Sequence, residues 1–322
     1  MSLLIGTFAF EMHIEAKIAT LERQRFKAQE IARAGFEYAK AILTAPEQTE
    51  EEDVAEVVEF QQGAKRIRRG LNLSNLTYEL PDGRFSVSIE HESGKRNINK
   101  LLADEWVLLL EQCDIPPTEQ NKLIDCYTDW IDEGDLHQLN GAESDDPFYT
   151  ELGYSCKNAP VETIKELLLI KNFTEATLYG GTTEDGDEIS GIADKLTVWG
   201  DGKVNLNSAS REVLMTFFEL EEGVIDEILD LWKGLDGEAD TEDDGFSSLA
   251  EIGLNQFKNK FTTQSSHLRI ISRARTENFV YEIQSVVHAD GKELQVLYWN
   301  ESFLSPDKLV TEPEQKEPSE NL

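Results

Sequence analysis

Apolar residues recur at the helical period from residue 4 to residue 45 and predict one long helix. No proline interrupts this pattern before Pro46. At 1.5 Å per residue, such a helix spans about 60 Å, which exceeds the width of most single domains. Its N-terminal half is therefore expected to project from its own domain and to pack against neighbouring helices or a membrane. The apolar positions are Phe8, Met12, Ile18, Leu21, Phe26, Ile31, Phe36 and Ile42.

An acidic linker over residues 46–59 separates this helix from segments that alternate with a period of two. Leu76–Leu80 and Phe85–Ile89 flank the turn sequence Pro81-Asp82-Gly83 and predict a β-hairpin. Three more strands are expected near the end of the chain, at 268–275, 279–287 and 293–299. Residues 305–322 are rich in Pro, Glu, Lys and Ser and are expected to form a disordered tail.

An internal repeat lies between the two groups of strands. Gly94-Lys95-Arg96-Asn97-Ile98-Asn99 recurs as Gly202-Lys203-Val204-Asn205-Leu206-Asn207. Each copy continues with an apolar helical run, an acidic loop and a Ser/Thr-x-x-Glu sequence, at Thr163–Glu166 and at Ser248–Glu251. Such a repeat indicates a duplicated supersecondary unit.

The helices of the repeat can be placed from their apolar runs and breaks. Copy one predicts helices at 101–113 and 119–131, the second capped by Thr118, and copy two predicts helices at 209–220 and 224–233. Ser208 or Ser210 is the expected cap in copy two, and Glu251 is expected to open a further helix.

Strands before and after the repeat suggest one domain interrupted by another. We expect an α+β fold in which a long N-terminal helix and an antiparallel sheet form a discontinuous domain over 1–93 and 266–304. The inserted all-α domain covers 94–265, with repeat one at about 94–180 and repeat two at about 202–265. An insertion of this size is tolerated when its two ends lie close together.

The chain is strongly acidic, with 63 Asp and Glu against 30 Lys and Arg and a net charge of −33. Such a surface repels nucleic acid. The repeat does resemble helix-hairpin-helix DNA-binding modules, in which glycine amides bind phosphate. Here the turns contain Pro116, Pro117, Glu221 and Glu222, which offer no amide or carry negative charge. We therefore expect no nucleic-acid partner, and DNA binding remains the least favoured alternative function.

One acidic loop has the spacing of a calcium site. Asp240, Glu242, Asp244, the carbonyl of Phe246 and Glu251 occupy positions 1, 3, 5, 7 and 12 of an EF-hand-type loop, with Gly245 at position 6. Glu242 at the third position departs from the usual pattern, and a solvated acidic loop is the competing interpretation. In copy one, Asp132, Asp135 and Glu143 form a second, less regular candidate that fits no standard spacing.

Nothing in the sequence predicts an enzyme. The five histidines are scattered, and neither Gly-x-Ser-x-Gly nor His-Glu-x-x-His occurs. Cys113, Cys126 and Cys156 form no Cys-x-x-Cys pair, so zinc binding has no support. One disulfide with one free thiol and three buried thiols both remain open.

Several segments, in order, resemble the K-class minor pseudopilins of type II secretion (GspK) over about residues 5–300. The resemblance implies a pilin-like α+β domain with a large helical insertion, calcium in that insertion and no catalytic activity. It also implies a place at the tip of a periplasmic pseudopilus, beside I-class and J-class pseudopilins. From the long helix and the bulk of residues 94–265, we expect the protein to start or terminate the filament there. The matching segments are Arg33–Ala39, Gly94–Asn99, Asp129–Asp132, Gly141–Glu143, Lys157–Pro160, Glu166–Leu168, Leu196–Trp199 and Gly202–Asn207.

The chain departs from that family at its start. Leu3–Phe10 is shorter than the roughly 20 residues that a membrane-spanning helix needs, and no prepilin leader is present. We therefore expect that most of a membrane anchor is missing here and that the full-length protein is periplasmic and anchored in the inner membrane. The main alternative function is a calcium-dependent extracytoplasmic binding module.

Overall fold

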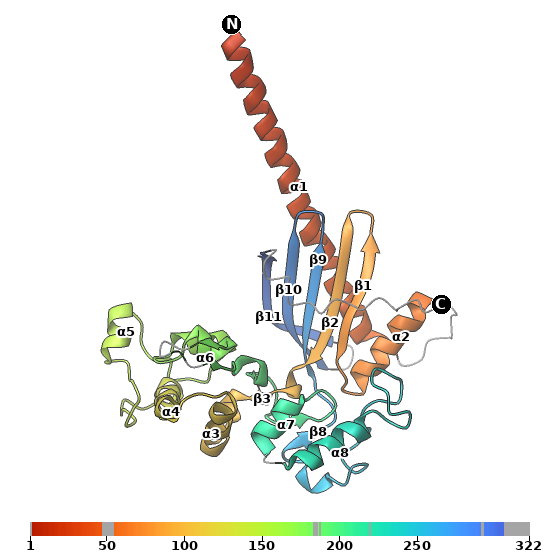
Figure 1. Cartoon of the computed structure of the whole chain (residues 1–322). Coiled ribbons are helices and arrows are strands. Elements are labelled where there is room, and N and C mark those ends of the chain that lie inside the picture. The colour runs from red at the N-terminus through yellow and green to blue at the C-terminus, as the bar shows by residue number, and fades with distance from the viewer. Residues whose placement is uncertain are drawn as a thin grey trace. The chain divides into compact units, whose positions relative to one another are not determined.

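Two distant stretches of the chain form one five-stranded sheet in the computed structural model (Figure 1). β1 lies at one edge and β11 at the other, in the order β1-β2-β9-β10-β11. The predicted turn connects β1 to β2 and pairs Leu80 with Gly83. The strands are β1 (Leu73–Leu80), β2 (Gly83–His91), β9 (His267–Arg275), β10 (Val280–Asp290) and β11 (Glu293–Leu304).

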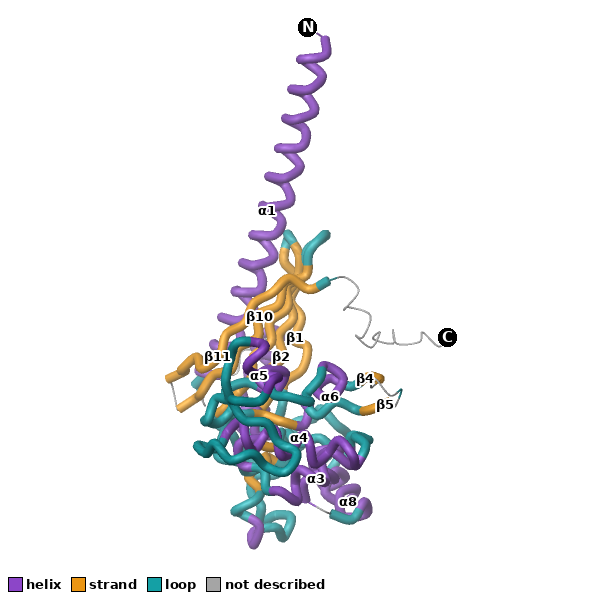
Figure 2. Tube along the Cα trace, turned by 90° about the vertical axis from the view of Figure 1, so that its left-hand side faces the viewer, coloured by secondary structure: helices purple, strands orange, loops and turns teal. Residues whose placement is uncertain are grey.

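Helix α1 (Ser2–Thr44) packs its C-terminal half on this sheet and projects beyond it with its N-terminal half (Figures 1 and 2). The contact is close at Gly35, where an added Cβ would overlap the Ser272 hydroxyl and lie 2.9 Å from a ring carbon of Phe85. The Ser272 hydroxyl in turn donates to the carbonyl of Ala32 at 2.8 Å. The predicted long helix and α+β sheet are thereby confirmed.

Helix α2 (Ala55–Arg68) corrects the prediction of a linker over residues 46–59. Ala64 and Ile67 of this helix are buried in the core of the sheet domain. Their spacing of three residues is helical, but the acidic run before them concealed it.

The structure describes residues 2–46, 55–182, 186, 188–218, 220–290 and 293–305. The predicted tail after Ser305 and the acidic run Glu50–Asp53 lie outside these residues. The chain divides into two compact units, the first made of Met1–Ile67, Asn72–Glu90 and Leu268–Leu322, and the second of Arg68–Leu71 and His91–His267. Within the described residues, no helix combines the length and apolar character needed to cross a membrane.

The second unit is built from short helices and turns around one apolar core that includes Trp106, Leu110, Leu123, Phe217 and Ile225. The two-residue strand that begins each copy pairs in parallel with a short strand that follows the helices of that copy. These pairs are β3 (Arg96–Asn97) with β6 (Leu196–Thr197) and β7 (Val204–Asn205) with β8 (Phe261–Thr262). A small antiparallel pair joins β4 (Gly181–Thr182) to β5 (Glu188–Ile189). The helices are α3 (Ala103–Gln112), α4 (Pro117–Ile131), α5 (Pro147–Leu152), α6 (Glu175–Tyr179), α7 (Arg211–Phe218) and α8 (Glu222–Trp232).

The structure differs from the sequence prediction at two of three helix ends. Thr118 does not cap α4, because the helix begins one residue earlier at Pro117 with Pro116 as its N-cap. Proline is favoured at this first position because its missing N–H would be unpaired there anyway. Ser210 does cap α7, since its hydroxyl accepts from the amide of Val213 at 3.3 Å. Glu251 lies in a turn and opens no helix.

The repeated asparagines make the same hydrogen bonds in both copies. Asn99 donates to the carbonyl of Val161 at 2.9 Å and accepts from its amide at 3.0 Å. Asn207 makes the same pair of bonds with Phe246, at 2.9 and 2.7 Å. Each asparagine thus fixes the loop that returns after the two helices of its copy.

The repeated glutamates are equivalent too. The carboxylate of Glu166 accepts from the amide of Glu162 at 2.9 Å, and that of Glu251 accepts from the amide of Ser247 at 2.7 Å. The predicted construction from two related helical units is therefore confirmed, and the repeated motifs are its hydrogen-bonding scaffold.

Candidate metal centre

Three acidic side chains converge where α4 ends. Asp129 lies in the last turn of α4, and Asp132 is its C-cap residue. Residues three apart on a helix share one face. The loop that follows brings Glu143 back to the same place, so that carboxylate oxygens of all three residues lie within 4.8 Å of one another. Acidic groups are unfavourable at a helix C-terminus, where the helix dipole is negative, so this placement calls for a compensating cation.

Backbone amides of the loop hold the cluster in place. Asp129 accepts from the amide of Gln138 through both oxygens, at 3.1 and 3.2 Å, and Asp132 accepts from the amide of Gly134 at 2.8 Å. Gly141 passes so close to Asp129 that an added Cβ would overlap its carboxylate. The Gly-Ala-Glu motif therefore has a steric reason for its glycine, which lets the chain carry Glu143 past Asp129.

Burial makes the cluster costly when it is charged. Asp129 is 0% exposed and Glu143 is 2% exposed. Neither oxygen of Glu143 has a hydrogen-bond partner among the described residues. Burial, followed by the charges of Asp129 and Asp132, raises the pKa of Glu143. Burial also raises the pKa of Asp129, against the opposing effect of the amide of Gln138.

These residues fit a hard divalent cation. Carboxylate oxygens are the ligands that Ca²⁺ prefers, and a bound ion would supply the partner that Glu143 lacks. A buried carboxylate without hydrogen bonds or a counter-ion is strongly unfavourable. The donor set contains no sulfur or imidazole, which argues for calcium or magnesium over zinc.

Two of the three predicted ligands of copy one lie in the acidic cluster. Asp132 and Glu143 lie in the cluster, whereas Asp135 is exposed in the following loop. The third member is Asp129, which was not predicted from the sequence as a ligand. Its signal was the Asp-x-x-Asp spacing at the end of a predicted helix, within the motif Asp129–Asp132.

Three of the predicted ligands of copy two already make hydrogen bonds within the second unit. The carbonyl of Phe246 accepts from Asn207, and Glu251 accepts from the amide of Ser247. Asp244 is buried and accepts from the amide of Thr241 at 3.0 Å. Asp240 and Glu242 are exposed. Calcium in this loop therefore stays a prediction, and it would require Glu251 to share or leave its amide partner.

A second feature with functional chemistry is the projecting half of α1. Phe10, Ile14 and Leu21, which we call the exposed stripe, are 64%, 40% and 47% exposed. Each precedes a buried residue of the sheet-packing face by 18 residues, which is five turns of a helix with 3.6 residues per turn. These buried residues are Ala28, Ala32 and Ala39. The exposed stripe thus continues the face that packs on the sheet, beyond the point where the sheet ends (Figure 2).

The first comparison with known proteins concerns families. The family described as Type II secretion system (T2SS), protein K, matches residues 70–179. This segment contains copy one of the repeat and all three residues of the acidic cluster. No curated protein sequence matches the chain.

The second comparison concerns folds. A chain in the crystal structure of the GspK-GspI-GspJ complex from the enterotoxigenic Escherichia coli type 2 secretion system superposes with a TM-score of 0.58 at 12% sequence identity. The match covers 89% of this chain and 99% of that one. Residues 70–179 thus match the protein K family of type II secretion, and the chain shares its fold with the matched chain of that complex, so both comparisons point to the K-class minor pseudopilins.

Proposed function

We propose that this protein caps the tip of a type II secretion pseudopilus and helps to start its assembly, as a non-enzymatic subunit joined to I-class and J-class minor pseudopilins. The observation that carries this proposal is the exposed stripe of α1. A helix face that packs on a sheet over residues 28–42 and then continues uncovered needs another apolar surface.

The energetics favour such a partner. Fully burying a large apolar side chain contributes about 1.5–3 kcal/mol. Phe8, Met12 and Ile18 are also at least half exposed on the projecting segment, so more than one side of the helix is apolar. A bundle of several helices would cover these sides better than one partner would, which agrees with the three-component complex named in the matched structure.

The capping role is supported by the size of the second unit, which contains His91–His267 and is inserted into the sheet domain. A subunit that carries so large an addition has less free surface for a further subunit in a regular filament. We place the protein outside the cytoplasm, in the periplasm, with its helix continuing toward an inner-membrane anchor.

Calcium is the second part of the proposal. Asp129, Asp132 and Glu143 would hold the ion and so fix the loop of residues 133–142 against the end of α4. An ion there would neutralise buried charge and stabilise the second unit, with no chemical step at the site.

Assembly can be tested with purified domains. The chain is mixed with the I-class and J-class pseudopilin domains from the same genome and analysed by size-exclusion chromatography with light scattering. We expect a 1:1:1 complex, which Leu21→Lys abolishes by placing a charge in the exposed stripe. Thr20→Lys adds the same charge on the polar side of the helix, away from both apolar sides, and should leave the complex largely intact. Failure of the wild-type chain to form the complex would reject the proposal.

The metal is tested by calorimetry with calcium on two double variants. Asp132→Ala with Glu143→Ala should abolish the binding heat. Asp240→Ala with Glu251→Ala should abolish only the part that belongs to the copy-two loop. An unchanged titration of the first double variant would remove calcium from the cluster at α4.

A further inference from the structure

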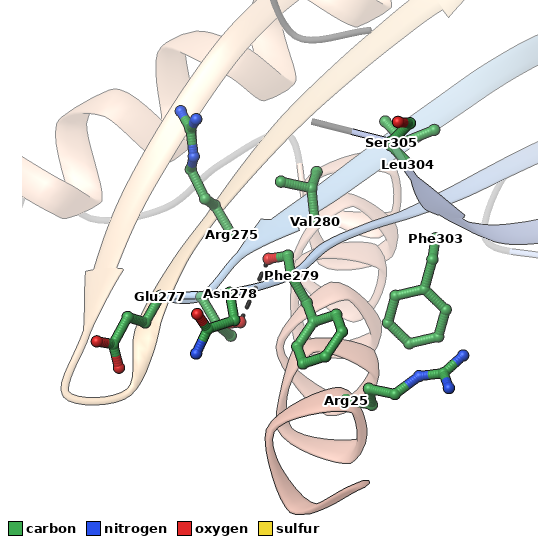
Figure 3. Close-up of a pocket in the computed structure, with 10 residues that line it drawn as sticks. Arg25, Arg275, Glu277, Asn278, Phe279, Val280, Phe303, Leu304 and Ser305 are labelled. Carbon is green, nitrogen blue, oxygen red and sulfur yellow. Dashed lines mark hydrogen bonds between the residues drawn. The ribbon is translucent and has the colours of Figure 1, made fainter. Parts of the chain in front are cut away.

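A cavity of about 500 Å³ lies where the exposed stripe of α1 meets the end of the sheet. We call it the junction pocket. Its volume is within the range of about 300–1,000 Å³ that is usual for ligand pockets. Its lining comes from α1, from the turn between β9 and β10 and from the end of β11 (Figure 3). The residues used below are Arg25, Arg275, Phe279 and Phe303.

The apolar part of the pocket is preformed. The rings of Phe279 and Phe303 meet edge to face, with centroids 5.7 Å apart. The guanidinium of Arg25 lies over the ring of Phe303, 4.5 Å from its centroid. The turn that carries Phe279 is fixed by the amide of Thr276, which donates to the carbonyl of Phe279 at 2.9 Å. A side chain that enters the pocket therefore meets a rigid aromatic wall.

The charge of the pocket opposes that of the chain. Neither Arg25 nor Arg275 makes an ion pair within the described residues, although the chain has 63 acidic residues for 30 basic ones. Nearby basic residues do find partners, as Lys27 does with Asp82 and Arg33 with Glu30. Glu277 also lines the pocket, with its carboxylate pointing away from both rings in Figure 3. The guanidinium of Arg275 also points away from both rings and from Arg25 in Figure 3, so Arg25 is the basic group that an acidic group beside the rings would meet.

The position of the pocket indicates what that molecule is. Leu21 of the exposed stripe precedes Arg25 by one helical turn. A helix that packs along the exposed stripe toward the sheet therefore reaches the junction pocket, where the sheet begins and the helix can pass no further on that face. The rings of Phe279 and Phe303 and the guanidinium of Arg25, which lies over Phe303, then contact side chains near the end of the partner helix.

We propose that the junction pocket receives an apolar anchor with an adjacent Asp or Glu, presented by the helix of a neighbouring minor pseudopilin that lies along the exposed stripe. This proposal rests on the proposed function, because it needs a helix on the exposed stripe. It adds a registration site: the ion pair with Arg25 sets how far the partner helix slides along α1. Charged groups at the rim of an interface contribute to partner choice and to the rate of association.

The experiment measures binding of the separate I-class and J-class domains to the full chain by calorimetry at two salt concentrations. We expect Arg25→Glu to raise the dissociation constant for one partner about tenfold. The dissociation constant of this variant should also change less with salt concentration than that of the wild-type chain. Arg23→Glu is the matched control, since Arg23 is an exposed arginine on the same helix outside the pocket. Circular dichroism verifies that both variants are folded.

A charge swap completes the test. Acidic residues of the affected partner's helix are changed singly to Lys, and one of these changes should restore binding to Arg25→Glu. If the wild-type complex forms and Arg25→Glu binds within twofold of Arg23→Glu, the pocket has no role in the contact and the inference is overturned while the proposed function stands. If the wild-type chain binds neither domain, both are overturned. Binding of free acetate or glutamate at the pocket with no effect of Arg25→Glu on either partner would also overturn the inference.

Discussion

Glu143 is deeply buried beside two acidic neighbours, and neither of its carboxylate oxygens has a hydrogen-bond partner in the part of the chain that the structure describes. We predict that Glu143→Gln has opposite effects with and without calcium. In a chelator at neutral pH, the neutral amide removes a buried charge, so the free energy of unfolding should rise by about 1–3 kcal/mol. With calcium at 100 times its dissociation constant, the wild-type protein should gain about 2.7 kcal/mol that the variant largely loses. Urea unfolding in both conditions measures the effect.

The control for this substitution is Glu133→Gln, which removes the same charge from an exposed residue of the adjoining loop. It should change the free energy of unfolding by less than about 0.5 kcal/mol in either condition. Equal effects of Glu143→Gln with calcium and with chelator would show that no ion binds at Glu143.

The raised pKa values of Asp129 and Glu143 predict a pH dependence with a defined sign. Without metal, the folded protein holds protons that the unfolded chain has already released. Stability from these groups is therefore complete below the unfolded pKa of about 4 and is lost as the pH rises through the raised folded pKa. With calcium the sign reverses, because protons compete with the ion and affinity falls as the pH falls. Unfolding midpoints from pH 4 to 8, with and without calcium, should diverge toward higher pH, and parallel curves would contradict this.

At the scale of the element, helix α1 approaches the sheet closely at Gly35. This close approach reverses the usual destabilising effect of a glycine inside a helix. Alanine is normally more stabilising than glycine inside a helix by about 1 kcal/mol. At Gly35, the added Cβ meets Ser272 and Phe85, so we predict that Gly35→Ala lowers the free energy of unfolding by about 1–3 kcal/mol. Gly223→Ala in α8 meets nothing within 4 Å and should raise it by about 0.5–1 kcal/mol. Thermal unfolding of both variants provides the comparison, and a shift of the same sign in both would refute the close approach.

The elements show which kinds of pattern can be interpreted from sequence. The long helix and the hairpin at Pro81-Asp82 were predictable because periodicity and turn chemistry are local properties. Helix α2 was missed because an acidic run precedes it and masks its apolar spacing. The helix at Glu251 was wrongly expected because a Ser-x-x-Glu sequence can close a turn as well as begin a helix. Asp129 was missed as a candidate ligand for a different reason. The path of the loop through Gly141 decides which acids meet, and that path is set by tertiary packing.

At the scale of the whole molecule, the insertion joins two neighbouring strands at one end of the sheet. Gly83 at the start of β2 lies against the carbonyl of Arg275 at the end of β9, so these two strands run in opposite directions. His91 at the end of β2 and His267 at the start of β9 consequently lie at the same end, where a hairpin turn would ordinarily connect them. Residues 92–266, which make up most of the second unit, therefore replace one turn of a complete five-stranded sheet; the remainder of that unit is Arg68–Leu71, between α2 and β1. The core of the sheet with α1 draws its buried side chains from the first unit.

This connection predicts that the first unit folds without the insertion. Replacing residues 92–266 by a short Asn-Gly turn should leave a soluble domain with cooperative unfolding, because closing a short loop costs less conformational entropy than closing the natural one. Heteronuclear NMR would show dispersed strand signals for β2 and β9 with cross-strand contacts between them.

The same variant separates the two parts of the proposed function. It keeps the exposed stripe and the junction pocket, so it should still bind the I-class and J-class domains, but it lacks the bulk proposed to block further subunits. In secreting cells, pseudopili that contain the variant should therefore grow longer than those with the full chain. Unchanged pseudopilus length together with intact binding would exclude capping by the insertion.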